Sequence, residues 1–127
     1  MQDRGLHKTF RGQYVPAEWN GKNEAGWKPI NDCVLVRPDK AADKVGTIII
    51  PEGEVYTQQL AAEAGVIVAL GDGAFVWDSL RQRKFEGARP EPGRRVSFEP
   101  YSGAKVMGDD GELYFTMRDR SIGAVKI

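Results

Sequence analysis

Ala104-Lys105-Val106-Met107 and Glu112-Leu113-Tyr114-Phe115-Thr116 flank the tetrapeptide Gly108-Asp109-Asp110-Gly111. Asp and Gly tolerate the backbone conformations of tight turns, so this stretch predicts a β-hairpin. Short strands separated by such turn signals are typical of a small all-β barrel or sandwich. The other apolar runs of the chain follow the same pattern, and together they predict an all-β fold.

Four further short strands are predicted, each bounded by glycine, by proline or by the end of the chain. Proline lacks the N–H that a strand ladder needs, and glycine favours turns, so both residues limit a strand. The best helix candidate, residues 58–64, is too short to be an independent element. The predicted strands are Cys33–Val36, Gly65–Leu70, Arg95–Phe98 and Ile122–Ile127.

Two of these strands, Cys33–Val36 and Val66–Leu70, are apolar on both faces, so neither face suits water. The chain also ends on an apolar residue, where polar ends that fray are usual. We therefore expect a neighbouring copy of the chain to cover the first and last strands; a monomer with well-packed termini is the alternative. The predicted subunit-interface residues are Val34, Val36, Ile122, Ala124, Val125 and Ile127.

Size and composition restrict the function classes. The 127 residues suffice for one domain with a core, and 18 basic residues balance 18 acidic ones, so no global field attracts nucleic acid or anionic lipid. No apolar run approaches the roughly 20 residues that cross a bilayer. The first ten residues lack the apolar region of a secretory signal, and the single cysteine excludes an internal disulfide. We therefore expect the protein to reside in a reducing cytosol.

The sequence offers no catalytic or metal-binding constellation. His7 is the only histidine, and Cys33 lies inside a predicted strand, where a small buried side chain is expected. Asp109–Glu112 lacks the alternating oxygen ligands of a cation loop, and Gly71-Asp72-Gly73 lacks the rest of a nucleotide-binding motif. We therefore expect neither an enzyme nor a cofactor.

Two segments are predicted to lie outside the core. Residues 1–26 form an N-terminal extension without a clear period, for which we expect partial order. The alternative is that Trp19 and Trp27 dock on the body. A basic cluster spans residues 81–95 and contains only Phe85 as a stacking platform, so it favours a solvated hairpin over a nucleic-acid patch.

Gly46-Thr47-Ile48-Ile49-Ile50-Pro51-Glu52 places three isoleucines inside a polar stretch. Pro51 stops the run, and charged, glycine-containing segments flank it. One interpretation is a short core strand. The other is an apolar tripeptide on a mobile loop, which a partner buries.

The chain resembles GroES-type co-chaperonins over residues 28–127. Residues 28–37 are similar to the opening strand of that family, and residues 46–52 to its mobile loop. Residues 65–73 resemble its Gly-x-Val-hydrophobic-Ala-hydrophobic-Gly-x-Gly segment. Pro92-Gly93 with Val96 and Phe98 matches a third strand in part, with Arg94 in place of the usual acid. The last hairpin is matched by residues 101–106 and 113–122, which include Arg118-Asp119 before Ile122.

This resemblance implies a small β-barrel over residues 27–127, with a mobile loop at about 40–59 and a roof-like hairpin at about 74–92. It implies a heptameric lid that caps the ATP-bound ring of a GroEL-type chaperonin around a substrate protein. The roof segment is longer and more basic than is usual in the family. The implied chaperonin-binding residues are Gly46, Thr47, Ile48, Ile49, Ile50 and Pro51, with Tyr101 facing the enclosed cavity.

Two other classes remain open at this point. A structural or interaction protein could use the same barrel as a building block of a larger assembly. A medium-chain dehydrogenase shares the fold in its catalytic domain, but the chain has no room for a dinucleotide domain and no zinc-ligand set. Co-migration with a chaperonin ring in the presence of nucleotide distinguishes a lid from a building block.

Overall fold

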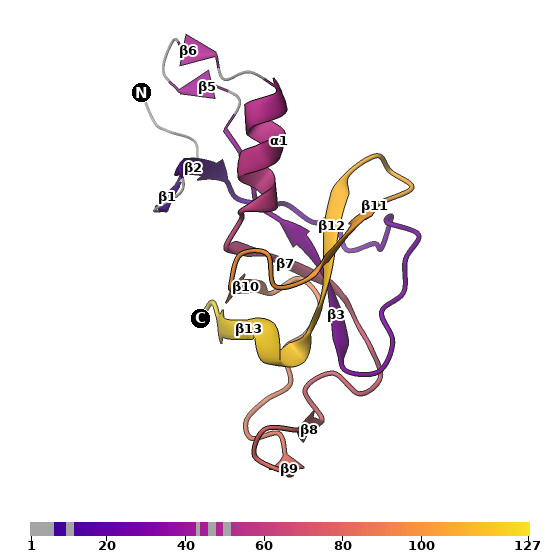
Figure 1. Ribbon diagram of the computed structural model, residues 1–127. Helices are drawn as coiled ribbons and strands as arrows, with labels where there is room; N and C mark the ends of the chain where they lie inside the picture. The colour runs from indigo at the N-terminus through magenta and orange to yellow at the C-terminus, as the bar shows by residue number, and fades with distance from the viewer. Residues whose placement is uncertain (1–6, 10–11, 43, 46–47, 50–51) are drawn as a thin grey trace.

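The computed structural model describes residues 7–9, 12–42, 44–45, 48–49 and 52–127. Its centre is a six-stranded antiparallel sheet with the order β11-β12-β3-β7-β10-β13 (Figure 1). The predicted all-β fold is confirmed; in the described part of the chain no pairing between β11 and β13 closes the sheet into a barrel. The strands are β3 (Cys33–Pro38), β7 (Ala64–Leu70), β10 (Arg95–Phe98), β11 (Ala104–Met107), β12 (Leu113–Arg118) and β13 (Ile122–Val125).

The C-terminal hairpin forms as its turn residues predict. β11 and β12 pair from Ala104↔Thr116 to Met107↔Leu113, and the Gly108 N–H donates to the Glu112 carbonyl at 2.8 Å. The Gly111 N–H donates to the Gly108 carbonyl at 2.9 Å, and Gly111 has φ of 81°, a conformation that glycine adopts at little cost. Local turn chemistry therefore sets the register of this edge of the sheet.

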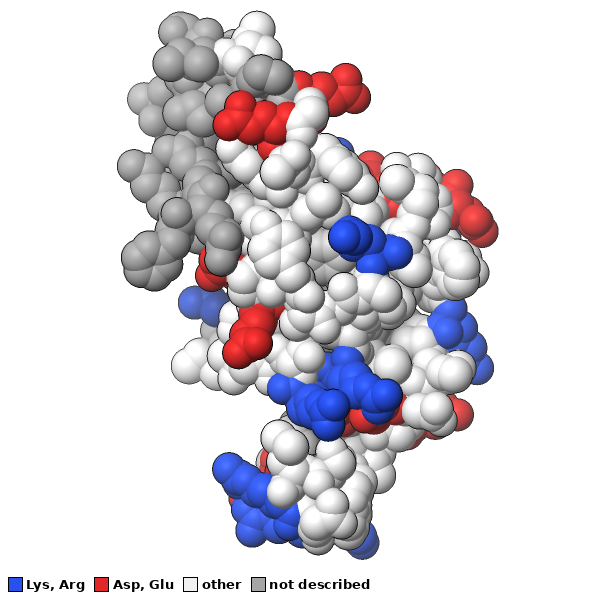
Figure 2. Space-filling view, in the orientation of Figure 1, with Lys and Arg blue, Asp and Glu red and all other residues white. Residues whose placement is uncertain are grey.

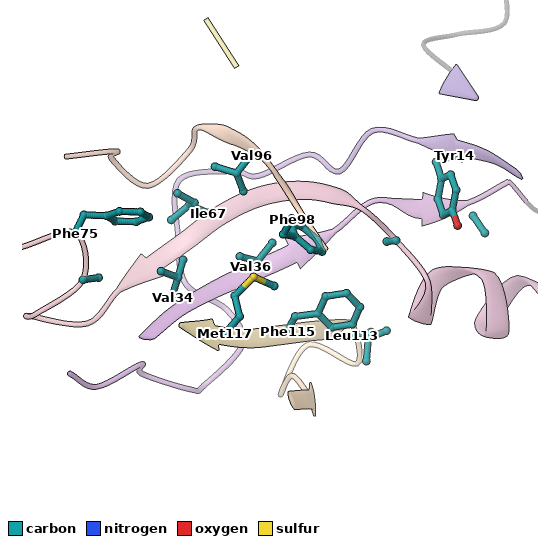
Figure 3. Packing of buried hydrophobic residues seen from close by; sticks show 13 residues of the cluster. Tyr14, Val34, Val36, Ile67, Phe75, Val96, Phe98, Leu113, Phe115 and Met117 are labelled. Carbon is teal, nitrogen blue, oxygen red and sulfur yellow. The ribbon is translucent and has the colours of Figure 1, made fainter. Parts of the chain in front are cut away.

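Each face of the central strands has its own apolar cluster. Val34, Val36 and Ile67 belong to the larger cluster, with Phe98, Phe115 and Met117 (Figure 3). Leu35 and Val68 point to the other face and pack with Ala25, Tyr114 and Trp19. The chain thus covers both faces of β3 and β7 with its own residues.

This arrangement bears on the predicted subunit interface at β3. Val34 and Val36 are 0% exposed, and β3 pairs with β12 on one side and with β7 on the other. A strand with two paired edges cannot receive a strand from a neighbouring subunit. Val34 and Val36 are buried in the larger cluster by residues of their own chain, and residues 19–25 cover the opposite face of β3, where Leu35 lies.

The single α-helix of the described residues begins earlier than predicted. α1 spans Glu52–Leu60, whereas the sequence favoured residues 58–64. Glu52 and Glu54 occupy its first turn, where carboxylates interact favourably with the helix dipole. The helix ends before β7 because Ala64 already pairs with Ser97. No helix among the described residues has the length and apolar character needed to cross a membrane.

Three small sheets lie outside the central one. β1 (His7–Thr9), β2 (Gly12–Val15) and β4 (Lys40–Ala41) form the first, and β5 (Lys44–Val45) pairs with β6 (Ile48–Ile49). β8 (Trp77–Asp78) pairs with β9 (Arg83–Lys84). The β5–β6 and β8–β9 pairs lie at opposite ends of the molecule, and the 3₁₀ helix Asp119–Ser121 precedes β13 (Figure 1).

The N-terminal extension contacts the body of the protein. Trp19 packs against the second cluster, and the Trp27 Nε1 donates to the Met107 carbonyl at 3.0 Å. Ala25 is buried, and its carbonyl accepts from the Asp109 N–H at 2.8 Å. At Gly26, φ is 77° and a β-carbon would overlap the Asp109 carboxylate, so a glycine is needed there. Both tryptophans therefore dock on the body.

Candidate functional site

Two residues of the apolar tripeptide, Ile48 and Ile49, lie at the end of the molecule that carries β5, β6 and α1 (Figure 1). Ile48 and Ile49 form β6, which pairs with β5 and is not a strand of the six-stranded sheet. Ile49 is 75% exposed. Of the other predicted binding residues, Gly46, Thr47, Ile50 and Pro51 lie outside the described residues. The exposure of Ile49 argues against a core strand here.

The helix α1 adds an exposed surface beside β6 that was not predicted from the sequence. Glu52, Glu54 and Thr57 are exposed, and Tyr56 is 48% exposed. Acidic side chains gather at this end of the molecule (Figure 2). The sequence signal for this surface was weak, because the helix has a mixed composition and was assigned to residues 58–64.

The base of the loop segment (residues 40–59) is held by an ion pair between the buried Asp39 and the half-buried Arg95. Asp39 is 1% exposed, and its carboxylate accepts from Arg95 Nη1 at 3.0 Å and from Nη2 at 2.8 Å. The hydrogen bond to Asp39 raises the pKa of Arg95. The Asp39 N–H donates to the Ala64 carbonyl at 2.9 Å. The residue before the loop segment is therefore fixed to β10 and to the start of β7.

The roof segment (residues 74–92) is fixed at its base by different contacts. Phe75 is buried in the larger cluster, and its N–H donates to Asp119 Oδ2 at 2.8 Å. Arg89 donates from Nε to the Ala74 carbonyl and from Nη2 to the Gly71 carbonyl, each at 2.8 Å. Ala74 and Phe75 thus belong to the core, and the exposed part of the roof segment begins at Val76.

Basic side chains gather over the β8–β9 end (Figure 2). Two of these charges have acidic partners nearby, because Arg81 lies 3.8 Å from Asp78 and Arg83 lies 3.3 Å from Glu86. Such partly compensated, exposed charges suit a solvated hairpin and weaken the electrostatic attraction that nucleic-acid binding requires. The prediction of a solvated hairpin agrees with this geometry.

The remaining predicted interface residues lie on or just after β13, one edge of which has no strand partner among the described residues. Ile122 and Val125 are partly buried against the core, whereas Ala124 and Ile127 are exposed. A groove of about 500 Å³ lies between the roof segment and β13, and its lining includes Trp77, Leu80 and Val125. Tyr101 lies after β10, with φ of 62° and an exposed side chain.

The described residues contain no group of three His, Cys, Asp or Glu side chains that could hold a metal ion. Cys33 is a free, half-buried cysteine in β3. The chemistry available at the loop end is therefore apolar contact framed by carboxylates, which suits binding of another protein.

Comparison with known proteins points to one family. The family model described as chaperonin 10 Kd subunit matches residues 27–126. A co-chaperonin GroES of Treponema denticola is 31% identical over 99 residues, which cover 77% of this chain and 94% of that protein. A co-chaperonin GroES of Neorickettsia sennetsu is 29% identical over 103 residues, or 81% of this chain and 96% of that protein.

Proposed function

Because the chain belongs to the chaperonin 10 Kd subunit family, we propose that it caps an ATP-bound chaperonin ring and encloses substrate proteins there. Co-chaperonins of this family are not enzymes, in agreement with the prediction from the sequence. The proposed partner is a large, GroEL-type chaperonin ring, which places the complex in the cytosol. Substrate proteins are indirect partners in this proposal, because the closed ring encloses them.

One observation carries the proposal: Ile49 is 75% exposed and lies on a small sheet outside the central one. Burying three isoleucine side chains contributes about 5–9 kcal/mol before any cost. Ordering the loop backbone costs about 1–2 kcal/mol per residue, so a single loop binds weakly. We therefore assign these residues to a low-affinity anchor, several copies of which bind together on one oligomer. They are Gly46, Thr47, Ile48, Ile49, Ile50 and Pro51.

Repetition requires a ring of subunits, and we propose a homo-oligomer with seven members. β13 has one edge paired with β10 and one edge without a strand partner among the described residues. An exposed strand edge is a template for pairing with another chain. We assign Ile122, Ala124, Val125 and Ile127 to this contact. Linked binding events of this kind raise avidity by factors of about 100–10,000.

The test is to replace Ile49 with Ser and to measure two quantities on the same protein. We expect the thermal midpoint to stay near that of the wild type, because the side chain is mostly exposed already. Co-migration with the chaperonin ring in the presence of ATP or ADP should be lost. Leu80→Ser is the matched control, since Leu80 is also 75% exposed but lies on the roof segment.

Two results would contradict the proposal. If Ile49→Ser unfolded the protein, with a cost of about 2–5 kcal/mol, the isoleucine run would be a core strand. If the ring captured Ile49→Ser as well as the wild type, the tripeptide would not be the anchor. Loss of capture in Leu80→Ser alone would move the contact to the roof end.

A further inference from the structure

The segment that precedes the family-matched residues is attached to both ends of the loop segment. We call residues 12–17 the N-terminal strap. β2 pairs with β4, with Tyr14 opposite Ala41 and Val15 opposite Lys40. β4 is the strand through which the chain enters the loop segment, and α1 is the helix through which it leaves. Contact between α1 and β4 brings the two together.

Tyr14 joins these two elements. Its backbone lies in the ladder with β4, and its hydroxyl donates to the Gln58 carbonyl of α1 at 2.8 Å. The side chain is 1% exposed and lies at the α1 end of the larger core cluster (Figure 3). A buried hydroxyl bonded to a helix carbonyl holds that helix at a fixed distance from the strand. Separating the two would leave polar groups unpaired, which is costly.

A second contact ties the strap to the base of the loop segment. The Ala17 N–H donates to Asp39 Oδ1 at 2.8 Å, on the carboxylate that also accepts from Arg95. Beyond the strap, residues 19–27 continue across the second core cluster to the β11–β12 hairpin, where the Ala25 carbonyl and the Trp27 indole are bonded. The N-terminal segment is therefore bound to the loop segment through the strap and to the β11–β12 hairpin through residues 19–27.

We infer that the N-terminal strap is a positioning device for the chaperonin-binding loop, and that Tyr14 is its central residue. The inference rests on the proposed function, since it concerns the same loop. The strap fixes β4 and α1, the two elements between which the tripeptide lies in the sequence. It thereby reduces the number of loop conformations in the free protein, and such preorganisation raises affinity. The family model matches residues 27–126, so the strap lies outside the matched domain.

The first measurement uses the free protein and no chaperonin. Tyr14→Phe keeps the buried ring and the strand pairing but removes the bond to Gln58. We expect amide hydrogen exchange across residues 52–60 to rise about fivefold or more, as loss of one stabilising hydrogen bond implies. Exchange in β12 should stay unchanged, because the central sheet is intact. Val15→Ala is the matched control, on the same strand but with a side chain that is 41% exposed.

The second measurement is binding to the chaperonin ring in the presence of ADP. Tyr14→Phe should weaken capture about tenfold, since each subunit carries the defect and the ring multiplies it. Tyr14→Ala should weaken it further, and Val15→Ala should bind as the wild type does. Unchanged exchange over residues 52–60 in Tyr14→Phe would overturn the inference even if Tyr14→Ala failed to fold.

The two measurements separate this inference from the proposed function. If Ile49→Ser and the wild type bound the ring equally, the loop would not be the anchor, while the exchange result would still decide whether the strap holds α1. If Ile49→Ser lost capture but Tyr14→Phe bound normally despite faster exchange, the strap would hold the helix without positioning the loop for binding, and the inference would be wrong.

Discussion

The loop end and the roof end of this protein both extend from the same central sheet, yet they are attached in different ways. The roof segment is fixed by a side chain of its own, Phe75, which is buried in the core and packs edge-to-face on Phe85 with ring centroids 5.4 Å apart. The loop segment is fixed by residues that come from elsewhere in the chain, above all Tyr14 and Arg95.

The two kinds of attachment differ in which residues fix the position of each segment. A hairpin anchored by its own buried ring can leave the body only if the core opens, so its position is part of the fold. The position of the loop segment depends instead on a separate segment, through hydrogen bonds that join residues 22 and 44 positions apart. Attachment of the second kind suits a part that changes partners, and the loop end also carries the exposed Ile49.

The largest effect is expected from removal of the Phe75 side chain, which anchors the roof segment. Phe75→Ala should lower the free energy of unfolding by about 3–5 kcal/mol, because it empties a buried site between the roof segment and the core. Urea denaturation followed by circular dichroism measures this loss. Phe85→Ala, whose side chain is 36% exposed, should cost about 1–2 kcal/mol. Equal costs would show that Phe75 is no special anchor.

The sequence predicted the strands of the central sheet well because their signals are local. The β11–β12 hairpin follows from Gly108–Gly111, and β10 follows from the turn before it. In each case, alternation and turn chemistry within a few residues decide the structure. The helix α1 was misplaced because its composition favours no clear helical face.

The attachment of the N-terminal segment could not be predicted in the same way. Tyr14 and Gln58 are 44 positions apart, and Ala17 and Asp39 are 22 positions apart. No period or motif links such pairs, and a lone tyrosine in a polar stretch gives no sign of burial. For the same reason the apolar second face of β3 was assigned to a neighbouring subunit. The tripeptide could be predicted as a binding site because its composition contrasts with its flanks.

A middle-sized effect concerns the site where the N-terminal segment crosses the sheet. Tyr114 packs there with Ala25 and Trp19, and its hydroxyl donates to Asp110 Oδ2 at 2.6 Å. Burial and this hydrogen bond raise the pKa of Tyr114 to about 12. The folded protein therefore holds this proton more tightly than the unfolded chain, whose tyrosine titrates near 10.

It follows that this contribution to stability is fully present below about pH 10 and is lost as the pH rises through about 12, by roughly 2–3 kcal/mol in all. Thermal midpoints measured from pH 8 to pH 12 should fall over that window, and Tyr114→Phe should show a smaller fall. A matched control is Tyr101→Phe, since Tyr101 is 61% exposed. An equal decline in both variants would remove Tyr114 as the cause.

The smallest expected effect comes from shortening the roof segment without touching its anchor. The Phe85 N–H already donates to the Val76 carbonyl at 3.0 Å, the bond that closes a β-turn. Replacing residues 77–84 with Asn-Gly would place Val76 and Phe85 at positions i and i+3 of a two-residue hairpin turn, for which this dipeptide is favoured. We expect the free energy of unfolding to change by less than about 1 kcal/mol, because the removed residues are largely exposed. Capture by the chaperonin ring should also be retained, since the loop lies at the other end of the molecule (Figure 1).

As a control, a longer replacement that also removes Phe75 should destabilise the whole domain. A large loss of stability in the short version would mean that Trp77 or Leu80 supports the core, and the two ends would then be attached alike.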